Sequence, residues 1–234
     1  MSLAVASRRG PLRRLDRGTL AHATRELCRR DADLANVVRR WGHPPLWGRR
    51  PGFATLLRII LEQQVSLASA RAMYQRLRGR VGEVTPGTVD ALGIPGLRDL
   101  GFTRQKAAYC HGLAVELLEA RLDLARLGRA SDADAQARLV ALKGVGPWSA
   151  GIYLLMALGR PDVWPPGDIA LLQAMQEVKG LRQRPTIPRA ERIARGWAPW
   201  RSVAARILWH HYLERRAALR RADWRNQPAE ETIR

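Results

Sequence analysis

The sequence predicts an all-α protein, and three observations support this fold class. Apolar residues recur at the spacing of a helix in most segments between the loops. Ser and Thr residues that can begin a helix, Thr103 and Ser131 among them, stand directly before some of these segments. No stretch shows the alternation of apolar and polar residues that is typical of a half-buried strand. We therefore expect a compact helical protein with short loops.

The N-terminal part is expected to be a basic arm followed by two helices. Residues 1–17 are rich in arginine, and we assign them no structure. A helix then begins near Leu20, and a shorter one over residues 31–41 ends before a glycine. We accordingly expect an arm and first helix over residues 1–30 and a main helical domain over residues 31–234.

A long, largely buried helix is expected over residues 53–77. Its apolar residues keep helical spacing, no Gly or Pro interrupts it, and Gly79 is placed to end it. Residues 84–102 are rich in Gly and Pro, so short turns are expected there. Further helices are expected over residues 103–120, 133–142, 147–158, 169–178, 188–195 and 199–221.

The charge balance points to a polyanionic partner. The 234 residues include 40 Lys and Arg against 21 Asp and Glu, a formal charge of +19, and nucleic acid is the commonest partner of such a chain. An arginine-rich ribosome-associated protein, or a surface adapted to an unusual proteome, is the alternative. The two cysteines, Cys28 and Cys110, exclude a four-cysteine iron–sulfur or zinc site and suggest a reducing cytosol. No apolar run reaches the roughly 20 residues of a membrane span.

The segment LKGVGPWSA, residues 142–150, predicts two helices joined by a tight hairpin. Gly144 and Gly146 permit a turn with exposed backbone N–H groups, and Pro147 suits the first position of a helix. Exposed amides beside a helix N-terminus form an anion site that a DNA phosphate can occupy. An ordinary corner between two helices is the alternative interpretation.

Asp168 is a single carboxylate followed by a run of apolar residues, 22 positions after Gly146. An aspartate in this place most often caps a helix. A carboxylate there is also favoured in its ionised form by the helix dipole. An anion is what an electron-poor sugar carbon needs beside it when its base departs. The two roles are compatible, so Asp168 is the candidate catalytic residue.

The hairpin followed by Asp168 resembles the HhH-GPD superfamily of DNA glycosylases, which is named after a hairpin, a Gly/Pro-rich loop and an aspartate. The segment LLRIILEQQVSLASA (56–70) resembles the superfamily's helix that carries the residue which fills the gap in DNA. Two further segments, GFTRQKAAYCHGLA (101–114) and WAPWRSVAARILWHHY (197–212), are similar to bacterial 3-methyladenine DNA glycosylases of type II. The resemblance spans residues 30–215 and implies a helix–hairpin–helix glycosylase fold, with two helical halves flanking an active-site cleft. It is closest to short forms that lack the N-terminal β domain.

Residue by residue, the resemblance implies that Asp168 is catalytic and that Trp148, Trp209 and Ile152 line the base pocket. Bifunctional members carry a lysine at the position of Trp148, where it forms a Schiff base and cleaves the strand. A tryptophan has no nucleophile, so a monofunctional enzyme without AP lyase activity is implied. Ile152 stands where the related enzyme has a pocket tyrosine, which leaves the substrate range open.

The resemblance also implies DNA contacts. Gln64 matches the residue that fills the gap left by a flipped nucleotide. The contacts expected on the hairpin are Lys143, Gly144, Val145, Gly146 and Ser149. A structural Na⁺, K⁺ or Ca²⁺ ion is possible at the hairpin, because the superfamily often holds one through main-chain carbonyls. Those carbonyls would here belong to Val140, Leu142 and Val145. No cofactor is required, and no iron–sulfur cluster is expected.

Two residues beside Gln64 have open roles. Gln63 is expected to be an exposed or helix-packing amide. Glu62 either enters the base pocket or pairs with an arginine such as Arg58, four positions earlier.

These observations together predict a monofunctional DNA glycosylase of base-excision repair. It would bind double-stranded DNA as a monomer in the bacterial cytoplasm, associated with the nucleoid, and excise alkylated purines such as 3-methyladenine and 7-methylguanine. Two alternatives remain: a glycosylase for another lesion, such as hypoxanthine or a mismatched or damaged pyrimidine, and a non-catalytic hairpin module that only binds DNA.

Overall fold

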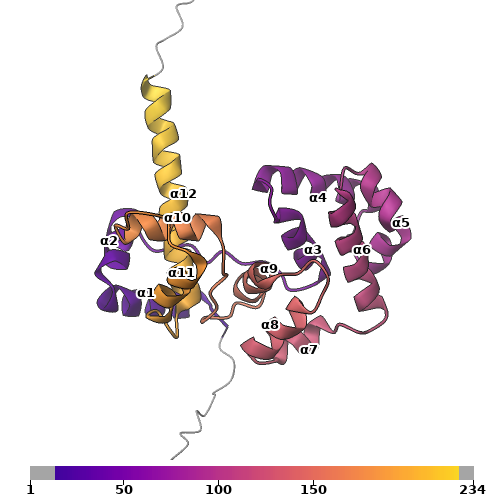
Figure 1. Ribbon diagram of the computed structural model, residues 1–234, viewed down its shortest axis with the longest axis horizontal. Helices are drawn as coiled ribbons and strands as arrows, with labels where there is room; N and C mark the ends of the chain where they lie inside the picture. The colour runs from indigo at the N-terminus through magenta and orange to yellow at the C-terminus, as the bar shows by residue number, and fades with distance from the viewer. Residues whose placement is uncertain (1–13, 227–234) are drawn as a thin grey trace, which may run out of the picture. The chain divides into compact units, whose positions relative to one another are not determined.

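The computed structural model describes residues 14–226, with side chains as far as residue 221 (Figure 1). The described part consists of helices and connecting loops without a strand, which confirms the all-α class. Most of the expected basic arm, residues 1–13, lies outside the described residues. The chain divides into two compact units. Unit 1 contains Trp47–Pro166, and unit 2 contains Arg17–Leu46 together with the chain from Gly167 onward.

Unit 1 is built around a short apolar helix. Its elements are α3 (Phe53–Glu62), α4 (Leu67–Val81), α5 (Pro86–Asp99), α6 (Arg104–Leu118), α7 (Leu124–Arg129), α8 (Asp132–Val140), α9 (Pro147–Ile152) and the π-helix η1 (Tyr153–Ala157). Helix α3 packs against α4, α6, α9 and η1. Five consecutive or near-consecutive side chains of α3 have no exposed surface: Leu56, Leu57, Ile59, Ile60 and Leu61. Because α3 is central, its C-terminal end is held firmly next to the hairpin.

Unit 2 is organised by its longest helix. Its elements are α1 (Arg17–Arg30), α2 (Ala32–Trp41), α10 (Ile169–Val178), α11 (Ile187–Arg195) and α12 (Arg201–Asn226). Helix α12 packs against each of the other four (Figure 1). The expected division at residue 30 does not coincide with the units, because α1 packs with α2 and α12. No helix among residues 14–226 has the length and apolar character needed to cross a membrane.

The expected helix over residues 53–77 is wrong, because the chain breaks into α3 and α4. Gln64 has a φ of +55°, which a continuous helix does not allow. Ser66 then caps α4, with its hydroxyl accepting the Ser69 N–H at 3.1 Å. Apolar spacing continues across the break, so the periodicity concealed a turn that the Ser66 cap could have indicated.

The short turns expected over residues 84–102 are also wrong, because this segment forms α5. Thr85 and Thr88 make a reciprocal capping box, and Pro86 occupies the first turn. Gly93, with a φ of +60°, kinks the helix just before Pro95. The glycine and proline that suggested turns therefore produce a kink between two helical stretches.

Most of the other helices lie where the sequence predicts them, but the short helix α7 (Leu124–Arg129), which Asp123 caps, was not predicted. Thr103 caps α6 and Ser131 caps α8, each through a hydroxyl that accepts a backbone N–H. The expected helix over residues 147–158 is present as α9 followed by η1, and α10 spans the predicted residues. An N-cap residue together with an apolar face was sufficient to locate these helices from the sequence.

Candidate functional site

The segment between α8 and α9 forms the predicted hairpin. Leu142 donates its N–H to Leu139 at 3.1 Å, and Val145 donates to Leu142 at 3.0 Å, so the turn is closed by two short backbone bonds. The Val145 side chain is 3% exposed and anchors the turn in unit 1. Lys143, in contrast, is exposed. The hairpin is therefore a rigid turn that presents its backbone and one cation to solvent.

The two hairpin glycines differ in how well the structure would accept a side chain at their positions. Gly144 has a φ of +87°, and a Cβ placed there would lie 2.2 Å from Cγ of Tyr109. It must therefore remain a glycine for the turn to form. Gly146 has an ordinary φ of −86°, and a Cβ placed there would meet nothing within 4 Å. Gly146 leaves open space at the N-terminus of α9, where a phosphate oxygen can approach the backbone amides.

Gln63 connects the end of α3 to this hairpin. Its Nε2 donates to the Gly144 carbonyl at 2.8 Å and to the Ser149 hydroxyl at 2.7 Å. Gln63 is therefore neither exposed nor a general packing amide. Ser149 is 1% exposed, and its buried hydroxyl accepts the Gln63 amide, so a DNA contact at Ser149, which stays a prediction, would fall to its backbone.

The turn after Gln63 is an exposed tip. Gln64 is exposed in the left-handed backbone region, and it is followed by Val65, 40% exposed, and Leu67, 68% exposed. Gln64 therefore stands on a turn whose neighbouring side chains are also open to solvent. The exposure agrees with a residue that enters DNA, although the role of Gln64 stays a prediction.

Glu62 has a structural partner. Its carboxylate pairs with Arg49 at 2.9 Å, and its side chain is only 10% exposed. Arg58, the alternative partner, lies over the Tyr74 ring at 5.0 Å from the centroid. Glu62 is thus an arginine-paired carboxylate, but its partner lies in the loop before α3 and not one helical turn earlier.

Asp168 caps α10, as the sequence predicts, and it is held by a second donor. Its Oδ1 accepts the Leu171 N–H at 2.9 Å and the indole N–H of Trp209 at 3.2 Å. Trp209, on α12, is 9% exposed. The edge of this indole therefore faces the carboxylate and fixes its orientation, whereas the sequence indicated only an aromatic pocket wall. No local pattern signals this contact, because it joins residues 41 positions apart.

Trp148 and Ile152 lie on α9 in unit 1. Trp148 is half-buried, and Ile152 is 5% exposed. A Cβ at Gly151 would lie 2.9 Å from Cα of Pro165, so the Pro-rich loop packs directly onto α9. Tyr153 points into the core, where its hydroxyl accepts the Gly52 N–H at 3.0 Å and burial raises its pKa. Trp148 is therefore more exposed than Ile152 and keeps part of its surface open.

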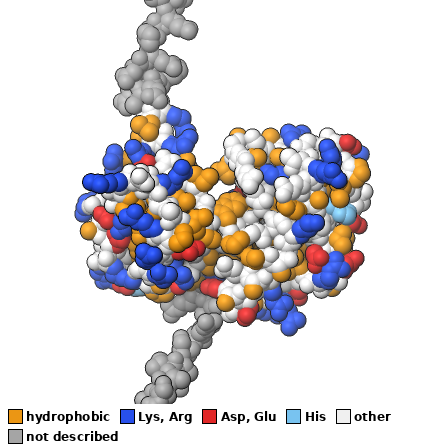
Figure 2. Space-filling view, viewed as in Figure 1, with side chains coloured by type: hydrophobic (Ala, Val, Ile, Leu, Met, Phe, Trp, Pro, Cys, Tyr) orange, Lys and Arg blue, Asp and Glu red, His pale blue; other side chains and the backbone are white. Residues whose placement is uncertain are grey.

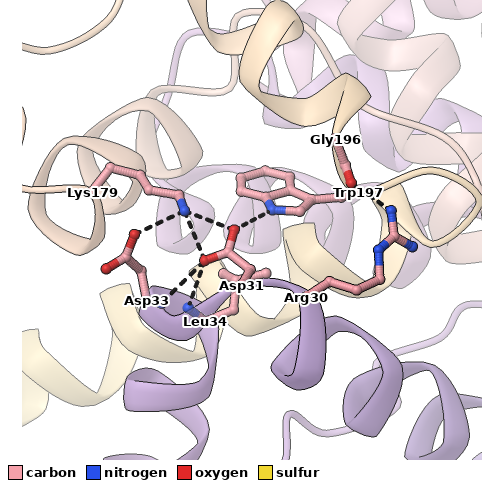
Figure 3. A network of polar contacts seen from close by, with 7 residues as sticks. All are labelled: Arg30, Asp31, Asp33, Leu34, Lys179, Gly196 and Trp197. Carbon is pink, nitrogen blue, oxygen red and sulfur yellow. Dashed lines mark hydrogen bonds and ion pairs between the residues drawn. The ribbon is translucent and has the colours of Figure 1, made fainter.

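A polar network fixes unit 2 around Asp31, at the junction of α1 and α2 (Figure 3). Lys179, at the C-terminal end of α10, donates to both Asp31 oxygens at 2.7 Å, and the Trp197 indole donates to Oδ2 at 2.7 Å. Arg30 donates to the carbonyls of Gly196 and Ala198. Burial opposes ionisation of Asp31, but the bonds from Lys179 and Trp197 outweigh it and lower its pKa. The network therefore ties the end of α10 to the loop before α12.

Lys and Arg side chains form several separate patches on the surface drawn in Figure 2. Exposed arginines on α4 and α11 include Arg71, Arg76, Arg78, Arg80, Arg189, Arg192 and Arg195. Within the described residues, no three His, Cys, Asp or Glu side chains are grouped to hold a metal ion. The charged surface thus favours a polyanion over a metal ion as the ligand.

Comparisons with known proteins identify the family of this chain. The model of the HhH-GPD superfamily, described as base excision DNA repair proteins, matches residues 57–199. YfjP of Bacillus subtilis, by its name a candidate DNA-3-methyladenine glycosylase, is 30% identical over 162 residues, which cover 66% of this chain and 56% of YfjP. DNA-3-methyladenine glycosylase 2 of Escherichia coli is 28% identical over 177 residues, which cover 69% of this chain and 60% of that protein. The chain thus spans little more than half the length of these relatives.

A solved structure shares the fold. The 3-methyladenine DNA glycosylase Mag1 of Schizosaccharomyces pombe, in complex with abasic DNA, superposes with a TM-score of 0.75 at 24% identity. The alignment covers 80% of this chain and 95% of Mag1. The match supports the helical fold predicted from the hairpin and Asp168.

Proposed function

The chain belongs to the HhH-GPD superfamily of base excision DNA repair proteins, and from this premise we propose that it is a monofunctional DNA glycosylase that excises alkylated purines. The observation that carries the proposal is the setting of Asp168. A half-buried carboxylate begins α10, and a backbone N–H and an indole N–H both bind its Oδ1. Such an anion is fixed in place before substrate binds, as electrostatic stabilisation of a cationic sugar requires.

The chemistry requires little else from the protein. A purine alkylated at a ring nitrogen is already a good leaving group, so the bond from C1′ to the base can break with its electron pair leaving on the base. Asp168 would stabilise the oxocarbenium-like sugar and orient a water molecule, whose oxygen then bonds to C1′ while its proton is released. The product is an abasic site in an intact strand. Binding energy directed at this transition state raises the rate without a general acid.

The aromatic residues would select the base. An indole face attracts a cationic base by about 1–2 kcal/mol when water is excluded. Trp148 has the surface for this contact and is proposed as a pocket wall together with Ile152 and Trp209. Because Trp209 is 9% exposed and donates to Asp168, it would contact the base through only a small part of its ring.

The absence of strand cleavage is part of the proposal. Strand cleavage through a Schiff base needs an amine at the position that Trp148 occupies, and an indole cannot form that bond. Lys143 is nearby in sequence, but it lies on the exposed turn before α9. Its charge suits a contact with a phosphate.

DNA binding is proposed to use the hairpin and the exposed tip. The backbone at Gly146 would receive a phosphate, and Gln64 would fill the gap left by the flipped nucleotide. A Na⁺, K⁺ or Ca²⁺ ion is proposed at the carbonyls of Val140, Leu142 and Val145. The Leu142 carbonyl already accepts the Val145 N–H, and its second lone pair fits a cation. We propose double-stranded DNA as the substrate and a monomer as the active form.

A panel of duplexes with single lesions tests the proposal. Each duplex would carry one base, namely 3-methyladenine, 7-methylguanine, hypoxanthine, a mismatched thymine or an undamaged purine. We expect release of the two methylated bases, and strand breaks only after alkali treatment. Release of hypoxanthine or thymine without release of either methylated base would show that alkylated purines are not the substrate. Strand breaks without alkali would contradict the monofunctional assignment.

A further inference from the structure

The Gln63 side chain makes two contacts that the proposed function does not use. Its Nε2 donates to the Gly144 carbonyl and to the Ser149 hydroxyl, 81 and 86 positions away in the sequence. A carbonyl oxygen only accepts hydrogen bonds, so the amide nitrogen must face Gly144. A donor group is therefore required at this position. Methionine, of similar size, and ionised glutamate, of the same shape, both lack it.

The next residue, Gln64, has a backbone conformation that needs support from both sides. A φ of +55° is uncommon for a residue with a Cβ. Such a conformation persists where the surrounding structure determines it. On one side, the Gln63 side chain is bound to the hairpin; on the other, Ser66 caps α4. The turn is thus fixed at both ends while the Gln64 side chain remains exposed.

We infer that Gln63 is a positioning residue that couples the phosphate-binding hairpin to the plugging residue Gln64, an inference that rests on the proposed function. The hairpin turn is rigid, because Gly144 packs against Tyr109 and Val145 is buried. When the hairpin binds a phosphate, the place of the Gly144 carbonyl is set. Because the Gln63 side chain is bound to this carbonyl, the position of the carbonyl also fixes the backbone of Gln64, one residue away. The coupling makes the protein selective for duplex DNA that contains a gap in its base stack.

A purely structural role is the rival explanation, and it makes a different prediction. If Gln63 only stabilises unit 1, its loss weakens binding to every duplex alike. If it positions Gln64, its loss weakens binding only where a gap is present, and it has no further effect once the Gln64 side chain has been removed. Coupled residues depart from additivity in this way, and independent ones do not.

A double-mutant cycle distinguishes the positioning role of Gln63 from a purely structural role. The variants are Gln63→Met, Gln64→Ala and the double variant, and the control is Gln136→Met, which alters a half-buried glutamine of α8. The measured quantity is gap selectivity, defined as the Kd for an undamaged duplex divided by the Kd for the same duplex with one tetrahydrofuran abasic analogue. We expect each single variant to lower gap selectivity about tenfold, the double variant to lower it no further, and the control to leave it unchanged.

Two results would overturn the inference. One is an equal loss of affinity for both duplexes in Gln63→Met; the other is a double variant whose loss is the product of the two single losses. If Gln63→Met does not fold, Gln63→Glu takes its place with the same expected result, and failure of both to fold would assign Gln63 a structural role only. The measurement needs no base release. A wild-type protein that excises no alkylated base would therefore refute the substrate class and leave this test intact.

Discussion

Replacing Asp168 by asparagine should separate the structural role of this residue from its chemical one. Its Oδ1 accepts the Leu171 N–H at 2.9 Å and the Trp209 indole N–H at 3.2 Å. An asparagine oxygen can accept both bonds, and Asn caps helices about as well as Asp. We therefore expect Asp168→Asn to change the free energy of unfolding by less than about 1 kcal/mol. The lost negative charge is the one large change.

The chemical effect of that charge can be estimated. A unit charge about 4 Å from a developing positive charge contributes about 4 kcal/mol at an effective dielectric constant of about 20. Each 1.36 kcal/mol or so of barrier corresponds to a factor of about ten in rate. We expect Asp168→Asn to slow excision of a methylated purine roughly a thousandfold.

Single-turnover kinetics with enzyme in excess measure this rate, and fluorescence anisotropy on a duplex with an abasic analogue measures affinity. Asp168→Ala is the matched variant: it loses the charge and also the cap, so it should be as slow as Asp168→Asn and about 1 kcal/mol less stable. An Asp168→Asn enzyme within tenfold of the wild-type rate would remove this carboxylate from the mechanism.

Three further predictions follow from the contacts. Trp209→Phe removes the 3.2 Å bond to Asp168, so excision should slow about tenfold in single-turnover assays with unchanged affinity for abasic DNA; an unchanged rate would contradict a positioning role. Gly144→Ala must displace Tyr109 and should lower the free energy of unfolding by about 2–4 kcal/mol in urea titrations. Gly146→Ala places its Cβ in open space, so this variant should fold normally and bind DNA more weakly. The pKa of Asp31 is lowered in the folded state, so its contribution to stability is present above the unfolded pKa of about 3.9 and is lost as the pH falls through the folded value. Below about pH 4 the Tm of the wild type should therefore fall more steeply with pH than the Tm of Asp31→Asn. Parallel curves of Tm against pH would contradict the stabilising role of the ionised Asp31.

Local patterns were sufficient where one residue decides the structure. Thr103 and Ser131 begin helices because their hydroxyls accept a backbone N–H three residues later. Asp168 obeys the same rule as a helix cap, whereas its catalytic role was implied by its place after the hairpin together with the resemblance to the glycosylase family. The same rule applied to Ser66 would have located the break between α3 and α4, which apolar periodicity concealed.

Contacts between distant segments could not be read from the sequence. Gln63 reaches Gly144 only because α3 is buried at the centre of unit 1 and ends beside the hairpin. Trp209 was expected as a pocket wall, but packing of α12 against α10 turns its N–H toward Asp168. In both cases the side-chain type was informative, while the partner depended on how the helices pack.

The proposed reaction draws on groups that are each supported within one unit. In unit 1, Gln63 and Gly144 are joined by a hydrogen bond that holds the hairpin beside the exposed tip. In unit 2, Trp209 orients Asp168 at the N-terminal end of α10, and Lys179 holds the other end to Asp31. Because each set of bonds lies within a single unit, we expect a substitution in the first to alter DNA affinity and gap selectivity, and one in the second to alter the rate of base release. That separation is what makes affinity and single-turnover rate independent reports on the two halves of the mechanism.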